Sequence, residues 1–268
     1  MGLSRNAPYP AHLSPAALAY KKLWPWYGSE YINSSTALTA LGSEWDCVGD
    51  GVIGGNSFMY VKAAAALAQG QLVTTATPTA STVTAAGSTV STIVWAAGGL
   101  TINAEKGNYL YIANSTVSGG GFTLREILSN TATTITISAV DPSIASKPAD
   151  QNVLEAIPTN GDVAIIIRPY RVIVNTATTV PCGVVLGTVT DTYYTIVQTK
   201  GLALISSVGN GTALAVGKPG VGSAAGVVIG SAADAANLFN GANLVAQSAY
   251  SAAGPGLTPF LINLKGQI

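Results

Sequence analysis

The sequence predicts an all-β protein, built from small β-barrel or sandwich modules that follow an extended, partly helical N-terminal arm. The first observation is that segments after residue 51 are rich in Thr and Val with period-2 stretches, and that Thr alternates with Ile in TATTITISAV at 131–140. The second is that Gly-bearing connectors of hairpin length, such as AAGS and SGGG, separate these runs. The third is length, because 268 residues permit one large all-β domain or two smaller ones.

Residues 1–50 are expected to form the arm. Four prolines precede residue 26, and six aromatic residues crowd the first 31 positions. The segment SPAALAYKKLW predicts one short helix, with Ser14 as N-cap and Pro15 at its first position. An arm with this many aromatic side chains is poorly solvated. We therefore expect it to lie across its own domain or across a neighbouring subunit, and both alternatives stay open. Its candidate interface residues are Trp24, Trp26, Tyr27 and Tyr31.

The rest of the chain is expected to form two modules. A β-rich module is predicted over 51–158, and a C-terminal β-barrel module over 159–268. The boundary follows from residues 141–162, where three prolines and a cluster of charges indicate a linker or a long loop.

A second division of the chain follows from a faint internal echo. FMYVKAAAALAQGQLV, at 58–73, runs much like the segment that begins YTIVQTKGLALI. Each has an aromatic strand, a Lys, small apolar residues and then a Gly. In this alternative, residues 51–75 belong with the C-terminal module and 76–158 form an insertion.

The run TDTYYTIVQTKGLALI places two tyrosines, a Gln and a Lys in an otherwise apolar strand. Strand alternation predicts that the odd positions from Tyr193 to Val197 face the core. The even positions from Tyr194 to Gln198 then form a surface for a neighbouring strand or subunit, which makes Tyr194 and Gln198 candidate interface residues. Gly201 is expected to end or bend this strand, because a glycine within a strand marks a bulge or a close backbone approach.

Arg168 and Arg171 form the only close arginine pair, and they flank Pro169 and Tyr170. A guanidinium can stack on Tyr170 or pair with a carboxylate across a subunit contact. An ordinary solvated edge is the alternative, since Pro169 belongs on an edge strand. We therefore include Arg168, Tyr170 and Arg171 among the candidate interface residues.

The composition favours assembly over binding to charged partners. Only 9% of residues are charged, against about 25% in an average globular protein. Twelve basic and twelve acidic residues balance, with no basic cluster for a nucleic acid, so we expect no nucleic-acid partner. Thr, Ser, Gly and Pro interrupt every long apolar run, which predicts no membrane-spanning helix.

The sequence offers little for catalysis. Twelve carboxylates are spread thinly and His12 is the only histidine, so no catalytic residue is nominated and the chain is not expected to be an enzyme. Cys47 and Cys182 lack metal-type spacing and are expected to be buried free thiols. Glu44, Asp46 and Asp50 fail the calcium-loop pattern. We expect neither a metal nor a cofactor.

Five segments of the C-terminal half together resemble a known module: a Gly-Val strand, an aromatic strand ending in QTKG, a small-residue hairpin, an AAGVVIG strand and an apolar terminal strand. They resemble the C-terminal β module of structural proteins on tailed-phage heads, a group that includes capsid decoration or cement proteins. The stretch KGNYLYIANSTVSGGGFTLREILSNTATTITIS is also similar to an element of such proteins. The five segments are 183–189, 193–201, 213–217, 225–229 and 260–264.

This resemblance implies a non-enzymatic protein on the outer surface of a virion, made in the host cytoplasm. Such proteins are usually dimers or trimers, and they clamp neighbouring subunits of the major capsid protein. We therefore expect a capsid decoration or cement protein. The alternative is a host-attachment protein of the virion, such as a tail fibre or adhesin, whose β module carries a binding tip.

Overall fold

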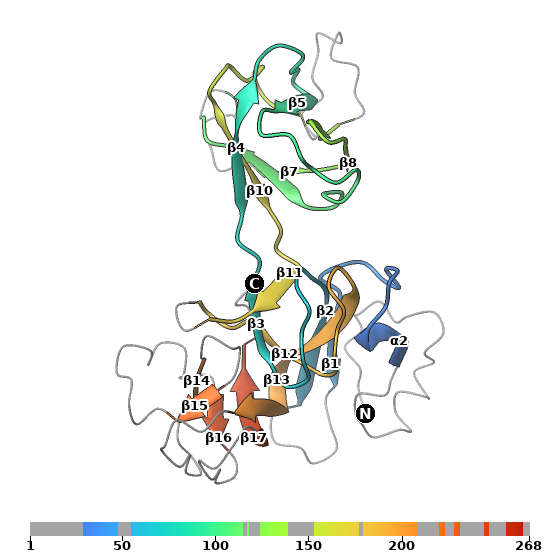
Figure 1. Cartoon of the computed structure of the whole chain (residues 1–268), viewed down its shortest axis with the longest axis vertical. Coiled ribbons are helices and arrows are strands. Elements are labelled where there is room, and N and C mark those ends of the chain that lie inside the picture. Colours follow the sequence, from blue (N-terminus) through green and yellow to red (C-terminus); the bar gives the residue numbers. More distant parts are fainter. Residues whose placement is uncertain are drawn as a thin grey trace. The chain divides into compact units, whose positions relative to one another are not determined.

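The all-β prediction is confirmed by the computed structural model of the chain (Figure 1). Apart from α2 (Ser29–Ile32), a single helical turn, every regular element in the described part of the chain is a strand. The helix expected near residue 14 lies outside that part. The structure describes residues 29–47, 55–114, 117, 124–138, 153–176, 179–207, 220–222, 228–230, 244–246 and 256–264.

The chain divides into two compact units. The first combines Met1–Ala76 with Tyr170–Ile268, and the second is Thr77–Pro169. The sequence pattern placed a module boundary near residue 158. The second unit extends to Pro169 because β10 (Val163–Ile167) pairs with strands of that unit, and β11 (Arg171–Val174) is the first strand after the chain returns to the first unit.

The first unit contains a ten-stranded sheet in which five strands pair in a closed ring, here called the first ring. The order around it is β2, β11, β3, β12 and β13, and β13 pairs again with β2. Only the β2–β11 pairing is parallel. The strands of this unit are β1 (Glu44–Cys47), β2 (Asn56–Ala63), β3 (Leu72–Thr75), β11, β12 (Gly183–Val185), β13 (Tyr194–Ser207), β14 (Gly220–Gly222), β15 (Val228–Gly230), β16 (Leu244–Ala246) and β17 (Gly256–Asn263).

The first ring has an apolar interior because alternate residues of its strands are apolar. Along β2, Met59, Val61 and Ala63 are buried and point inward. Burying alternate side chains of every strand around a closed ring gives one shared core and removes unpaired strand edges. The core also contains Leu67, Val73, Val172, Cys182, Val185, Val189 and Val197.

β13 is the longest strand of the chain as described, with 14 residues, and it contributes to two parts of the first unit. Its first half pairs with β2 and β12, and its second half pairs with β17. Around the second half lies another cluster, which includes Ala203, Ile205 and Phe260. The two halves meet at Gly201. The strand continues through this residue instead of ending there, and the structure has the close backbone approach that was the other expectation.

The second unit is a seven-stranded sheet that also closes on itself, here called the second ring. Its two outermost strands, β7 and β8, are the two ends of one extended segment, 125–130. On one side the Ile127 N–H donates to the Asn108 carbonyl oxygen, and on the other the Leu128 N–H donates to the Thr136 carbonyl oxygen. The strands are β4 (Thr79–Thr84), β5 (Thr92–Trp95), β6 (Tyr109–Ile112), β7 (Arg125–Glu126), β8 (Ser129–Asn130), β9 (Thr134–Thr136) and β10.

Alternation of Thr with apolar residues builds the core of the second ring. Ile135 of β9, with Ile93 and Trp95 of β5, lies in the interior. The threonines between them face outward, as the period-2 pattern of TATTITIS predicts. The remaining buried members are Val83, Leu110, Ile112, Val117, Ile127, Ile137, Leu154, Ala164 and Ile166.

Gly201 has a backbone that only glycine adopts without strain. Its φ is +99°, and the pairing of β13 with β2 shifts register between Gln198 and Lys200. A Cβ at this position would lie 2.6 Å from the carbonyl oxygen of Gly55. A side chain here is therefore excluded both by backbone conformation and by the close approach of a neighbouring backbone.

We expect Gly201→Ala to lower the free energy of unfolding of the first unit by at least about 2 kcal/mol, because strain and a backbone clash add together. Gly107→Ala is the control, since Gly107 also has a positive φ, +79°, but nothing lies within 4 Å of its added Cβ. That substitution should cost about 1 kcal/mol from the backbone alone. Urea unfolding of both variants measures the costs, and equal losses would contradict the close approach at Gly201.

Candidate functional site

The aromatic end of β13 lies in a cluster of rings. Tyr194 stacks on Tyr60 of β2, with ring centroids 5.9 Å apart and an interplanar angle of 10°. The ammonium of Lys62 lies 5.0 Å from the centroid of the Tyr194 ring, which is a cation–π distance. These contacts follow from register, because Tyr194 pairs with Lys62 and lies diagonally across from Tyr60.

Tyr31 packs into the same cluster and is only 1% exposed. Its ring meets those of Trp45 and Tyr60 edge to face, at centroid distances of 6.4 and 5.8 Å. Burial raises the pKa of Tyr60, although the Leu38 N–H donates to its hydroxyl at 3.0 Å and lowers it. Tyr31 therefore packs on its own domain, which is one of the two alternatives expected for the arm. Its buried ring does not contact a neighbouring subunit.

Gln198 is also interior, at 1% exposure, so the expectation that it presents an amide on the surface is wrong. Its Nε2 donates to the carbonyl oxygens of Lys200 and Leu202, each at 3.0 Å, within its own strand. The amide nitrogen therefore bonds to the backbone of β13 on both sides of Gly201, next to the register shift between Gln198 and Lys200. Both faces of the first half of β13 are covered, one by the core of the first ring and the other by the aromatic cluster.

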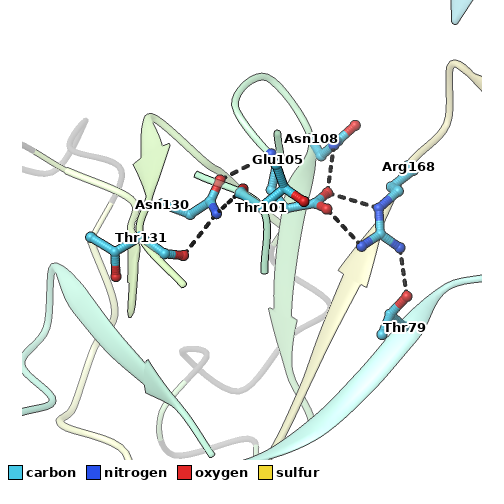
Figure 2. Close-up of polar contacts among 7 residues, drawn as sticks. All are labelled: Thr79, Thr101, Glu105, Asn108, Asn130, Thr131 and Arg168. Atoms are coloured by element: carbon cyan, nitrogen blue, oxygen red, sulfur yellow. Dashed lines mark hydrogen bonds and ion pairs between the residues drawn. The ribbon is translucent and has the colours of Figure 1, made fainter. Parts of the chain in front are cut away.

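Arg168 belongs to the best-connected polar group of the second unit (Figure 2). Its Nε and Nη2 donate to the two carboxylate oxygens of Glu105, at 2.7 and 2.9 Å, and its Nη1 donates to the Thr79 hydroxyl at 2.6 Å. The side chains of Arg168 and Glu105 are 10% and 6% exposed. A carboxylate partner was among the predicted alternatives for Arg168, but this carboxylate lies in the same unit and not across a subunit contact.

Glu105 also anchors the loop between β5 and β6. Its carboxylate accepts from Asn108 Nδ2 at 2.9 Å, and its own N–H donates to Asn130 Oδ1 at 3.0 Å. Asn130 in turn donates to the carbonyl oxygens of Thr101 and Thr131 (Figure 2). The group thus joins the loop to Asn130 of β8 and to Arg168 at the end of β10.

Two of the remaining predicted residues belong to a different unit from Arg168. Tyr170 and Arg171 lie in the first unit, where Tyr170 packs beside the core of the first ring and occupies the space next to Gly42. A Cβ on Gly42 would come within 2.4 Å of the Tyr170 ring. The predicted residues Trp24, Trp26 and Tyr27 lie outside the described residues.

Among the described residues, the grouping of possible metal ligands and the one described cysteine thiol bear on metal binding and reactivity. Where side chains are described, no three His, Cys, Asp or Glu residues are grouped to hold a metal ion. Burial raises the pKa of the Cys182 thiol to about 12, so this thiol stays protonated and unreactive at neutral pH. Cys182 thus has the buried free thiol that the sequence predicts for it.

The sequence pattern missed an apolar outer surface on the second ring. In β10, Ala164 and Ile166 point inward, while Val163, Ile165 and Ile167 point outward. VAIII is apolar at both parities, which indicates that both faces of a strand make contacts. The apolar run can be read from the sequence. Only the structure shows that Ala164 and Ile166 face the core and that the other three residues face outward.

We expect Arg168→Met to lower the free energy of unfolding of the second unit by about 3 kcal/mol, because it leaves the Glu105 carboxylate buried without its ion-pair partner. Adding Glu105→Gln should recover part of the loss. Lys106→Met is the control, because it removes an exposed cation next to Glu105 in the sequence. It should change the free energy of unfolding by less than about 0.5 kcal/mol. Thermal unfolding tests all three variants, and equal effects of Arg168→Met and Lys106→Met would contradict a specific ion pair.

A search for membrane-spanning helices and a comparison with known proteins complete the description of the chain. The described part of the chain has no helix with the length and apolarity needed to cross a membrane. No protein-family model, curated protein or solved structure matches the chain.

Proposed function

We propose that this chain is a decoration or cement protein of a tailed-phage capsid, which binds the outer shell surface and bridges subunits of the major capsid protein. The resemblance of its C-terminal segments to phage-head proteins motivates the proposal. The observation that carries it is that large apolar side chains are exposed on both units. They are Leu38, Val180, Leu202, Leu204 and Leu257 in the first unit, and Ile102, Leu124, Leu128, Ile157 and Val163 in the second.

The physics of a lattice supports this role. A surface with 9% charged residues has few groups whose desolvation opposes contact with another protein. Neutral copies can also lie side by side without the repulsion that equal net charges would cause. When one copy makes several modest contacts with the shell at the same time, the contacts together give a higher affinity than any one of them alone.

The interior polar groups support a structural role rather than catalysis. The most connected of them, around Glu105 and Arg168, is used to hold a loop to the ring. The Gln198 amide is used in the same way, to satisfy the backbone of β13 near Gly201. In both groups the polar atoms serve the fold, as expected of a protein whose task is to present a stable surface.

We expect the purified chain to add to undecorated shells of its own phage at a fixed number of copies per capsomer, and to raise the temperature at which these shells are disrupted. Differential scanning calorimetry with and without added protein measures the shift. Shells from an unrelated phage serve as the control. Absence of binding to the cognate shell would contradict the proposal.

Electron cryomicroscopy of the particle separates this role from its alternative. Regular density across the seams between capsomers is the expected result. Density confined to the tail or its fibres would instead assign the chain to host attachment.

A further inference from the structure

The outward side chains of β4, β6 and β10 make one continuous apolar surface on the second ring, here called the β4–β6–β10 face. Opposite residues in antiparallel strands share a face. Ile165 pairs with Tyr111 on one side and with Ala80 on the other. The face comprises Ala80, Thr82, Tyr109, Tyr111, Val163, Ile165 and Ile167.

This surface is not part of the core. The interior cluster of the ring takes Leu110, Ile112, Ala164 and Ile166 from the same strands, which are the residues of opposite parity. Val163 is 39% exposed, and Tyr109, Tyr111, Ile165 and Ile167 are each partly exposed. An antiparallel strand with one solvated face normally carries polar side chains there, so three aliphatic residues and two tyrosines in register indicate a contact surface.

The seven residues of the face carry no charge, and Glu126 of β7 lies opposite Tyr109 at its edge. The charges at the ends of β10 are held within the unit. At one end, the Asp162 carboxylate accepts from the Asn114 side chain at 2.9 Å and from the Thr159 N–H at 2.8 Å. At the other end, Arg168 pairs with Glu105. Over most of the face a partner therefore meets apolar and hydroxyl groups, whose desolvation costs little.

The size of the face selects the kind of partner. Three adjoining strands about 4.8 Å apart, with about five residues each at about 3.4 Å per residue, give roughly 250 Å². A stable interface between two free proteins buries about 800 Å² on each partner. The face alone is therefore too small to hold a second copy in solution, and it suits a partner that holds the chain through other contacts at the same time.

We infer that the β4–β6–β10 face docks on an uncharged apolar patch of the major capsid protein. This inference rests on the proposed function and names the surface of the second unit that performs it. The tyrosines supply rigid area with a polar end, and Val163, Ile165 and Ile167 supply the apolar centre that excludes water.

The test uses the full chain, undecorated cognate shells and three Lys substitutions. Val163→Lys and Ile165→Lys place an unpaired charge in the contact, and each should weaken binding to shells by at least about 30-fold. Ala132→Lys is the matched control, because Ala132 is exposed and lies in the turn between β8 and β9, two strands that pair with none of the three strands of the face. It should bind within about threefold of the unaltered chain. Co-sedimentation with shells measures affinity, and circular dichroism and thermal unfolding show whether each variant is folded. Should Ile165→Lys not fold, the more exposed Val163→Lys carries the test.

The outcomes separate the two proposals. If the unaltered chain binds shells and folded Val163→Lys binds equally well, the face is not the docking site and the proposed function stands. If the unaltered chain does not bind shells at all, both fail. Loss of self-association in Val163→Lys, with shell binding unchanged, assigns the face to a second copy and overturns the inference. A large loss of thermal stability with shell binding unchanged assigns the face to the chain's own packing and overturns it equally.

Discussion

The close approach of the β2 backbone to Gly201 is the constraint on which the first unit depends. β13 closes the first ring with its first half, and its second half forms the base to which β17 is hydrogen-bonded. One strand belongs to both assemblies because its pairing changes from β2 to β17 next to Gly201. The positive φ of Gly201, the register shift before it and the Gln198 amide together allow that change.

The second unit solves the same problem of closure in a different way. Its ring closes because the segment 125–130 pairs first with one neighbour and then with the other, so no bend at a single glycine is needed. The loop before β6 is held by polar contacts through Glu105, Arg168 and Asn130, and by Leu100, which packs against the core of the ring. A buried ion pair contributes less net stability than its distances suggest, but it penalises any arrangement in which one partner is displaced.

Periodicity predicts the strands and their buried faces well, and it predicts partners across the sheet poorly. TATTITIS alternates so regularly that its inward residues, Ile135 and Ile137, can be named from the sequence. Arg168 and Glu105 are 63 residues apart, and nothing local to either indicates the other. Gln198 shows the same limit, because alternation places it on the second face of β13 without showing that an aromatic cluster covers that face. The echo between residues 58–73 and the segment from Tyr194 is informative in hindsight, since β2 and β13 are direct neighbours.

The two chain crossings between the units have a consequence for how such a protein changes over evolution. In the first unit, the Ala76 N–H donates to the Arg171 carbonyl oxygen at 2.7 Å, so the ends of the gap left by the second unit are adjacent. In the second unit, Thr79 and Ile166 are paired across β4 and β10, so its own two ends are adjacent as well. A short turn can therefore replace residues 77–169 without moving a strand of the first ring. Adjacent ends of this kind are the geometry at which one domain can be inserted into another without disturbing the host fold.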